Sequence, residues 1–425
     1  SSAVKADTTS ASSSSAVKAD TTNASSSSTV NTANTDANSD KTAPIPIDTW
    51  MPDKALQNAI LDNLQHNYDS SITSFDQDNM KHIYNLTLSG IGDLKGLEYA
   101  ENLYDLTIKN SNITDYAPLE NLQNLDSLSI EWPTDKENNN NLGLALTTIL
   151  QNDKRLYQLT ISLSHRQNIV DDLSSVINQL GNIYSETSFN FNLSDNAIDD
   201  TTLASLLNQL KGLPSISTLD FSNNNISNLD SLSAYLKNSD NQIYGLILDN
   251  NKISDISPLT QWVLENRYYF NLKVDNQMII YPEIIIPNGQ SSYNQSNPVI
   301  DLNGNNNQLP MRPDSTIIEK GKYSQNQIIW NNLQKNGTLI SHWNDSAAYE
   351  SAEAEAAYES ASAAYEGGHE GGHSGVSDRI PHWQGGNFSY SYSGTILQPY
   401  QRSTQPTQPT QPTQPTQPTQ PTQPT

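Results

Sequence analysis

The chain has 425 residues, enough for two or three domains, yet hydrophobic residues make up only 35% of it and its formal net charge is −24. This acidity disfavours nucleic acid and anionic membranes as partners, because the 22 Lys and Arg residues are scattered and form no basic cluster. The absence of cysteine excludes disulfides and thiolate metal sites, and no run of 18 apolar residues predicts a membrane-spanning segment.

The first 45 residues are rich in Ser, Thr and Ala and contain one block twice, at 1–9 and 14–22. Such a segment has almost nothing apolar to bury, so it cannot offset the entropy lost on ordering. We therefore predict a disordered leader over 1–45. The chain begins at Ser1 rather than Met, and we expect a removed signal peptide before it.

Residues 46–82 predict a helical cap. Asp53 precedes a run in which Leu56, Ile60, Leu61 and Leu64 fall on one helical stripe, and a second short helix is expected over 77–82. A solenoid exposes apolar surfaces at its ends, so a capping unit is required where the repeats begin.

Residues 83–277 repeat one phrase eight times: an apolar residue, two variable residues, then apolar, variable, apolar. This is a leucine-rich-repeat pattern, which predicts an α/β solenoid with a parallel sheet on its concave face. The short early repeats predict tight convex turns, and the longer middle ones predict helices, as at 169–180. Asn196, Asn224 and Asn251 share one register, and we expect their amides to pair with turn backbone groups. The copies begin near Ile83, Leu103, Leu125, Leu156, Ser188, Ile216, Ile243 and Tyr269.

After Gln277 the pattern changes to short strands separated by Pro, Asn and Gly, which predicts an all-β sandwich over 278–400. A low-complexity insertion occupies 346–386, and a last strand is expected at 388–397. Gln-Pro-Thr triplets then predict an extended, polyproline-like stalk over 401–425. The other expected strands are 278–281, 284–287, 299–302, 316–318, 328–330 and 338–343.

Four segments together resemble the internalin-type surface proteins of Gram-positive bacteria. Residues 51–60 resemble that family's helical cap, 86–100 its first repeat and 253–259 its turn phrase. The segments at 275–280, 297–304, 327–330 and 388–399 are similar to the Ig-like domain that follows the repeats in that family. The resemblance spans about 47–400 and implies a capped solenoid followed by an Ig-like domain. The middle repeats are longer than the family's usual 22 residues, so no family ligand is carried over.

The variable strand positions supply the candidate binding residues. Side chains alternate along a strand, so the positions between the leucines face or border the concave surface. Aromatic residues recur in one such column and small polar residues in another, a combination that suits a glycan or a wet protein interface. The alternative is that tyrosine is simply well accommodated at strand edges. The predicted partner-binding residues are Tyr84, Tyr104, Thr107, Lys109, Tyr157, Thr160, Phe189, Asn192 and Tyr244.

One catalytic motif occurs literally, since His369-Glu-Gly-Gly-His373 matches the HExxH pattern of zinc proteases. That motif requires a helix to place both histidines on one face, and the glycines here disfavour a helix. A flexible loop is the favoured interpretation over adventitious metal binding or a protease. We therefore predict no enzyme activity, no cofactor and no metal.

The sequence as a whole predicts a secreted or cell-surface, cell-wall-associated protein of Gram-positive type that binds a host or environmental protein or glycan. We expect a monomer without nucleic-acid binding or membrane insertion. The alternative is a structural scaffold that binds other proteins of the cell envelope. No Leu-Pro-x-Thr-Gly sorting signal follows the triplets, so the anchoring mode is left open.

Overall fold

The computed structural model describes most of the chain between residues 45 and 403. The predictions for the leader, for most of the low-complexity insertion with its HExxH motif, and for the Gln-Pro-Thr triplets lie outside the described residues. Those residues are 45–133, 136–151, 156–180, 187–213, 215–238, 243–265, 269–302, 312–313, 321–349 and 387–403.

The helical cap is present where the sequence predicts it. A short helix α1 (Ile47–Trp50) precedes α2 (Lys54–Asn67), and a 3-10 turn η1 (Asn79–His82) follows. Helix α2 buries Leu56, Ile60 and Leu64 of the predicted stripe and leaves its polar face exposed.

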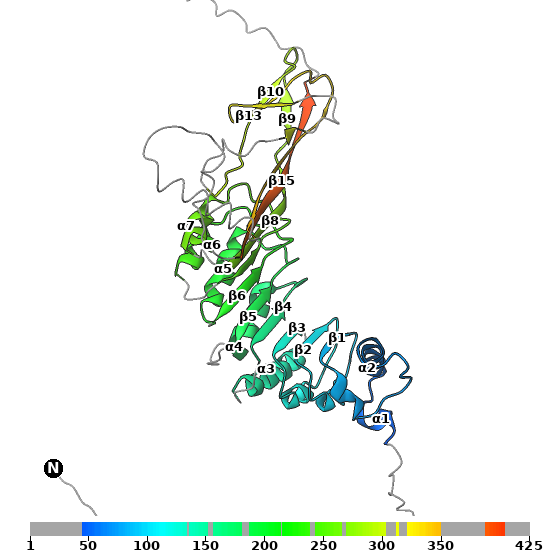
Figure 1. Ribbon diagram of the computed structural model, residues 1–425. Helices are drawn as coiled ribbons and strands as arrows, with labels where there is room; N and C mark the ends of the chain where they lie inside the picture. Colours follow the sequence, from blue (N-terminus) through cyan, green and yellow to red (C-terminus); the bar gives the residue numbers. More distant parts are fainter. Residues whose placement is uncertain are drawn as a thin grey trace, which may run out of the picture. The chain divides into compact units, whose positions relative to one another are not determined.

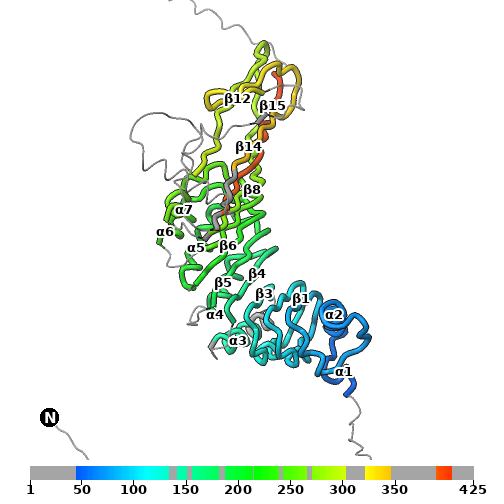
Figure 2. Tube along the Cα trace, viewed as in Figure 1, coloured from blue at the N-terminus to red at the C-terminus, as the bar shows by residue number. Residues whose placement is uncertain are grey.

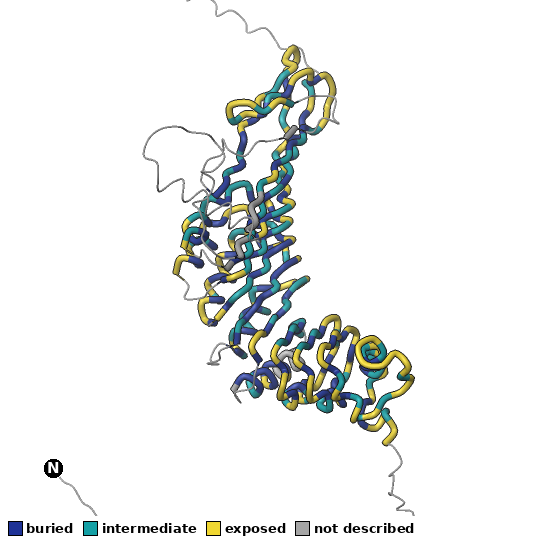
Figure 3. The backbone as a smooth tube through the Cα atoms, viewed as in Figure 1, coloured by how far each residue is buried: buried dark blue, intermediate teal, exposed yellow. Residues whose placement is uncertain are grey.

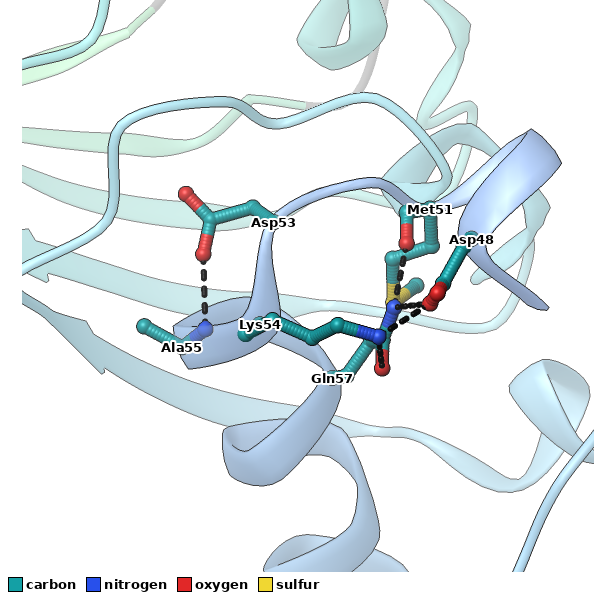
Figure 4. A network of polar contacts seen from close by, with 6 residues as sticks. All are labelled: Asp48, Met51, Asp53, Lys54, Ala55 and Gln57. Atoms are coloured by element: carbon teal, nitrogen blue, oxygen red, sulfur yellow. Dashed lines mark hydrogen bonds and ion pairs between the residues drawn. The ribbon is translucent and has the colours of Figure 1, made fainter.

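Asp53 joins the cap to the first repeat. One oxygen of its carboxylate accepts the N–H groups of Ala55 (2.8 Å) and Leu56 (3.0 Å), which caps α2, as Figure 4 shows in part. The other oxygen accepts the N–H groups of Gly92 (2.7 Å) and Asp93 (3.0 Å). Burial raises the pKa of this carboxyl, but the four backbone hydrogen bonds outweigh it, so the net pKa is below its ordinary value.

A second set of polar contacts holds α1 against α2. The amide of Gln57 donates to the Asp48 carboxylate (2.8 Å) and to the Met51 carbonyl (2.6 Å), and Lys54 forms an ion pair with Asp48 (Figure 4). These contacts fix the chain that enters the solenoid.

Each of the eight predicted repeats contributes one strand to a continuous parallel sheet, with β1 to β8 in sequence order (Figure 1). The strands are β1 (Asn85–Ser89), β2 (Asp105–Lys109), β3 (Ser127–Glu131), β4 (Gln158–Ser162), β5 (Ser188–Asn192), β6 (Ile216–Asp220), β7 (Gly245–Ile247) and β8 (Tyr269–Ile280).

Helices and turns line one side of this sheet, and their size follows repeat length. The two early repeats hold only the 3-10 turns η2 (Leu97–Tyr99) and η3 (Ala117–Asn121). Later repeats hold α-helices, and α4 spans the predicted residues 169–180. Leucines and isoleucines of strands and helices form a buried band between the two layers (Figure 3). The remaining elements of this layer are α3 (Lys136–Gln151), α5 (Asp200–Leu210), α6 (Asp230–Asn238), η4 (Ser257–Leu259) and α7 (Thr260–Glu265).

The predicted asparagine ladder is confirmed and is longer than predicted. Asn224 accepts the N–H groups of Asn196 and Ile198 (both 3.0 Å), and its amide donates to carbonyls of two successive repeats. Asn251 repeats the arrangement one turn later by accepting the Ile226 N–H (3.0 Å). Gln277, which is fully buried, then takes the same role toward Ile253 (3.0 Å). The turns of successive repeats are therefore joined by buried side-chain amides.

The repeat phrase shifts by two residues within the sheet. In β1 and β2 the first buried residues of the two strands pair with each other, Leu86 with Leu106. Strands β3 to β5 are followed by a third buried residue, Trp132, Leu163 or Leu193. A bulge follows between β5 and β6. Leu219 of β6 therefore pairs with Phe191, the second of the two buried phenylalanines of β5. As a result, equivalent letters of the phrase do not lie side by side throughout the sheet.

The sheet continues beyond the repeats without a break. Strand β8 pairs in parallel with β15 (Asn387–Arg402), which pairs antiparallel with β14 (Gly337–Tyr349), and Figure 2 shows the three strands together. The predicted boundary at residues 277 and 278 falls inside β8. A second sheet has the order β10-β13-β12. The other strands are β9 (Ile284–Ile286), β10 (Tyr293–Ser296), β11 (Arg312–Pro313), β12 (Lys322–Ser324) and β13 (Gln327–Trp330).

The expected strands after the repeats have mixed outcomes. Residues 284–287, 328–330, 338–343 and 388–397 all lie in or overlap strands. Residues 299–302 do not form one, since Ile300 makes only an isolated bridge to Asp255. Residues 316–318 lie outside the described part of the chain.

Candidate binding face

A tyrosine occupies the position just before the strand in three of the first four repeats, and Asp126 occupies it in the third. The backbone fixes this row: the N–H of Tyr104 donates to the Tyr84 carbonyl (2.9 Å), and the N–H of Asp126 donates to the Tyr104 carbonyl (2.9 Å). The N–H of Tyr157 continues the series by donating to the Asp126 carbonyl (2.8 Å). We call Tyr84, Tyr104, Asp126 and Tyr157 the tyrosine row.

The aromatic side chains of this row remain in solvent. Tyr84 is 49% exposed, Tyr104 46% and Tyr157 68%, although tyrosine has a large apolar surface that would gain from burial. The row ends in the fifth repeat, where the next position is the buried Thr187. The structure therefore brings three of the predicted aromatic residues together on one strand edge.

Phe189 does not belong to this row, and the prediction that its side chain borders the open surface is wrong. It pairs with Leu159 of β4 and is fully buried. The error arises because the repeat phrase of β5 is shifted by two residues relative to that of β4. Counting along the phrase that contains Asn196 places Phe189 at a surface position, but the pairing with β4 places it in the core.

Tyr244 is exposed (47%) but occupies a different register. Tyr244 lies one residue before Gly245, which pairs with Thr218. Tyr157 lies three residues before Thr160, the residue of β4 at the position equivalent to Gly245. The N–H of Tyr244 donates to Ser217, the residue inserted by the bulge. Tyr244 is thus an exposed aromatic residue on the same sheet that does not continue the tyrosine row.

A second row of small polar residues runs across the middle of the strands. Thr107 and Thr160 belong to it as predicted, and both side chains are partly exposed. Asn192 does not, because Asn190 pairs with Thr160 and donates to its hydroxyl (3.3 Å). We call this set the central row, and its members in sheet order are Thr87, Thr107, Ser129, Thr160, Asn190, Thr218, Gly245 and Asn271.

A third row lies two residues beyond the central row on each strand and contains charged side chains. Lys109 pairs with Ser89 and is exposed, and Asn192 lies between Ser162 and Asp220. Towards β8, burial raises the pKa of Asp249, and the neighbouring Asp275 carboxylate adds to the shift. Lys273 pairs with Ile247 at the β8 end of this row, so this end of the sheet carries charges of both signs.

Three consecutive repeats form an open depression of about 400 Å³ at the tyrosine row. Asn102 and Asn124 occupy equivalent positions there, and their amides donate to the carbonyls of Lys81 in the cap (2.8 Å) and of Glu101 in the first repeat (2.7 Å). Tyr104 is also held, since its hydroxyl accepts the amide of Asn85 (3.0 Å). The full lining is Tyr84, Asn102, Tyr104, Asn124 and Asp126.

The sequence-based selection of site residues omitted Asn102, Asn124 and Asp126. The signal was present, since an asparagine directly precedes the first leucine of two successive repeats. These residues contribute hydrogen-bonding groups, while Phe189 contributes none and is buried.

Metal binding and membrane crossing find no support within the described ranges. No group of three or more His, Asp or Glu side chains there is arranged to hold a metal ion. None of the helices that the structure describes is long and apolar enough to cross a bilayer.

No protein-family model matches the chain, and no curated protein matches it. Among solved structures, internalin C2 from Listeria monocytogenes is 22% identical, with 56% of this chain and 88% of that chain covered and a TM-score of 0.30. Listeria monocytogenes InlP is 14% identical, with 84% and 99% covered and a TM-score of 0.30. A structure of the CBM51-2 and INT domains of Clostridium perfringens ZmpB is 12% identical, with 83% and 35% covered and a TM-score of 0.17. These TM-scores are too low to support an inference, so the fold and site described above stand on their own geometry.

Proposed function

We propose that this protein is a non-enzymatic binding protein of the bacterial cell surface that recognises an extracellular protein or glycan through the open face of its repeat sheet. The observation that carries the proposal is the tyrosine row. Three aromatic side chains stay about half exposed or more, in register on neighbouring repeats, although burial would stabilise them.

The side chains of the central row and the third row are suited to binding a partner rather than to catalysing a reaction. The central row offers hydroxyl and amide groups that hydrogen-bond in either direction, and the third row adds Lys109, Lys273 and the carboxylates of Glu131 and Asp220. Tyrosine beside small polar groups is typical of wet recognition surfaces, where the ring supplies contact area and the polar groups supply orientation. Binding without turnover accounts for this arrangement.

The rigidity of the sheet supports the same function. Every member of the tyrosine row is held by backbone hydrogen bonds to the next repeat, and the side-chain ladder of Asn196, Asn224, Asn251 and Gln277 joins the turns of the repeats from the fourth onward. A preformed surface loses little conformational entropy on binding, which favours affinity.

We extend the proposal to the domain plan of the chain. The two sheets after β8 are consistent with an Ig-like domain over 278–400 that contains the insertion 346–386, next to a cap over 46–82 and repeats over 83–277. Location on or secretion from a Gram-positive cell, and a monomeric state, belong to the same proposal.

The test is binding of the purified chain to arrays of extracellular matrix proteins, mucins and glycans, followed by the double variant Tyr104→Ala with Tyr157→Ala. We expect the variant to fold, because both side chains are exposed, and to bind at least tenfold more weakly. Tyr68→Ala is the matched control, because Tyr68 is equally exposed (50%) but lies in the cap, stacked on His82. Unchanged binding by the double variant would contradict the proposal. Binding confined to proteins of the same cell envelope would instead identify a scaffold.

A further inference from the structure

We infer that the depression at Tyr84, Tyr104 and Asp126 is a saccharide subsite that takes one uncharged sugar ring with adjacent hydroxyl groups. The inference rests on the proposed function and assigns a ligand class to one part of the same face. Its volume, about 400 Å³, lies within the range of about 300–1,000 Å³ found for small-ligand sites.

The polar groups of the depression are mostly hydrogen-bond acceptors. The amide nitrogens of Asn102 and Asn124 each use one of their two N–H groups on a backbone carbonyl, which fixes the side chain and leaves its carbonyl oxygen as an acceptor beside one further N–H. The Asp126 carboxylate makes no hydrogen bond within the part of the chain that the structure describes, and it is exposed. Three acceptors on successive repeats therefore require a ligand that carries several donors.

The aromatic groups require an apolar face on the same ligand. Tyr84 and Tyr104 belong to adjacent strands, which lie about 4.8 Å apart in a sheet. The hydroxyl of Tyr104 is held by Asn85, so this ring is restrained before a ligand arrives. A pyranose ring combines the two requirements, because its C–H face stacks on tyrosine while its hydroxyls donate around its edge.

Electrostatics decides between sugar classes. Asp126 lies in the depression and Asp105 begins the neighbouring strand, in a chain whose net charge is −24. Sialylated or sulfated sugars would place a negative charge beside these carboxylates, which costs free energy. The subsite should therefore select neutral sugars. An arginine side chain would satisfy Asp126, but it offers no hydroxyl-like donors spread over three repeats.

The experiment titrates the full chain with glucose, galactose, mannose, N-acetylglucosamine and lactose, and with sialic acid and N-acetylarginine amide for comparison, and binding is followed by saturation-transfer NMR. We expect at least one neutral sugar to bind in the millimolar range, as suits a ligand of this size, without loss of affinity in 0.5 M salt. Asp126→Ala and Tyr84→Ala should each weaken it at least tenfold, with the far-ultraviolet spectrum unchanged. Tyr244→Ala, an exposed tyrosine outside the depression, should leave the affinity within twofold of the wild type.

Three outcomes would overturn the inference: no binding of any neutral sugar, equal affinity in the Asp126→Ala variant, or a response only to N-acetylarginine amide or to sialic acid. The result is separable from the proposed function. Loss of a macromolecular ligand in the Tyr104→Ala, Tyr157→Ala variant without any sugar binding would leave the binding face intact and remove the subsite. Sugar binding that depends on Asp126, with macromolecular binding unaffected by that double variant, would support the subsite and contradict the proposed binding face.

Discussion

Replacing Asn224 by alanine should strongly destabilise the repeats. The side chain is 7% exposed, and its carbonyl accepts the N–H groups of Asn196 and Ile198 (both 3.0 Å). Its amide donates to the carbonyls of Leu193 (3.1 Å), Phe221 (2.9 Å) and Ser222 (3.0 Å). The substitution therefore leaves two N–H groups and three carbonyls without their side-chain partner.

The magnitude follows from those five groups. A buried polar group without a partner costs about 1–3 kcal/mol, and two N–H groups alone give about 2–6 kcal/mol. Carbonyls retain a second lone pair, so they add less. We expect a loss of about 3 kcal/mol in the free energy of unfolding, which lowers the melting temperature by about 6–12 °C for a unit of this size.

The assay is urea and thermal unfolding followed by far-ultraviolet circular dichroism. Asn208→Ala is the matched control, because Asn208 is an exposed residue of α5. It should change the free energy of unfolding by no more than about 0.5 kcal/mol. The reasoning fails if Asn224→Ala is as stable as this control.

Three further predictions concern the cap, the junction after the repeats and the tyrosine row. Asp53→Ala should cost about 2 kcal/mol, since it removes the α2 cap and two hydrogen bonds to the first repeat. Because the folded pKa of Asp53 is below its ordinary value, this contribution is present at neutral pH and is lost as the pH falls through the folded pKa. The wild type and the variant should then converge in unfolding experiments at acid pH, and a constant difference would contradict the assignment. Gly394→Ala should lower the free energy of unfolding by about 1–3 kcal/mol in chemical unfolding, because an added Cβ meets the Trp343 ring and lies 2.7 Å from the Gln277 carbonyl. A fully stable variant would show that β15 does not pack there. Phe189→Ala should cost about 3–5 kcal/mol and Tyr157→Ala less than about 0.5 kcal/mol, and similar melting temperatures for the two variants would refute the register described here.

Much of the fold could be predicted from local sequence patterns. The spacing of Leu56, Ile60 and Leu64 located α2, and the repeat phrase located the eight strands of the solenoid sheet. The helix α4 was predicted with its observed bounds because its buried residues follow a strict helical period. These are short-range features, in which each residue is judged against neighbours on the same element.

The register between repeats could not be predicted in the same way. The phrase around Asn196 is internally regular, yet the preceding repeat aligns Leu159 with Phe189, and a third buried residue, Leu193, follows the strand. Phe189 was therefore assigned to the surface and Asn192 to the wrong row. Asn102 and Asn124 were missed because their role depends on contacts across repeats, which a single repeat does not reveal.

The exposed tyrosine row is the centre of the account, and footprinting of the bound complex tests it most directly. The chain is oxidised by hydroxyl radicals with and without the ligand found on the arrays, and the modification of each tyrosine is read by mass spectrometry. We predict that Tyr84, Tyr104 and Tyr157 are protected at least threefold, while Tyr68 of the cap is modified equally in both states. Protection of Tyr68 alone, or of no residue of the row, would contradict the claim that this protein binds through the open face of its repeat sheet.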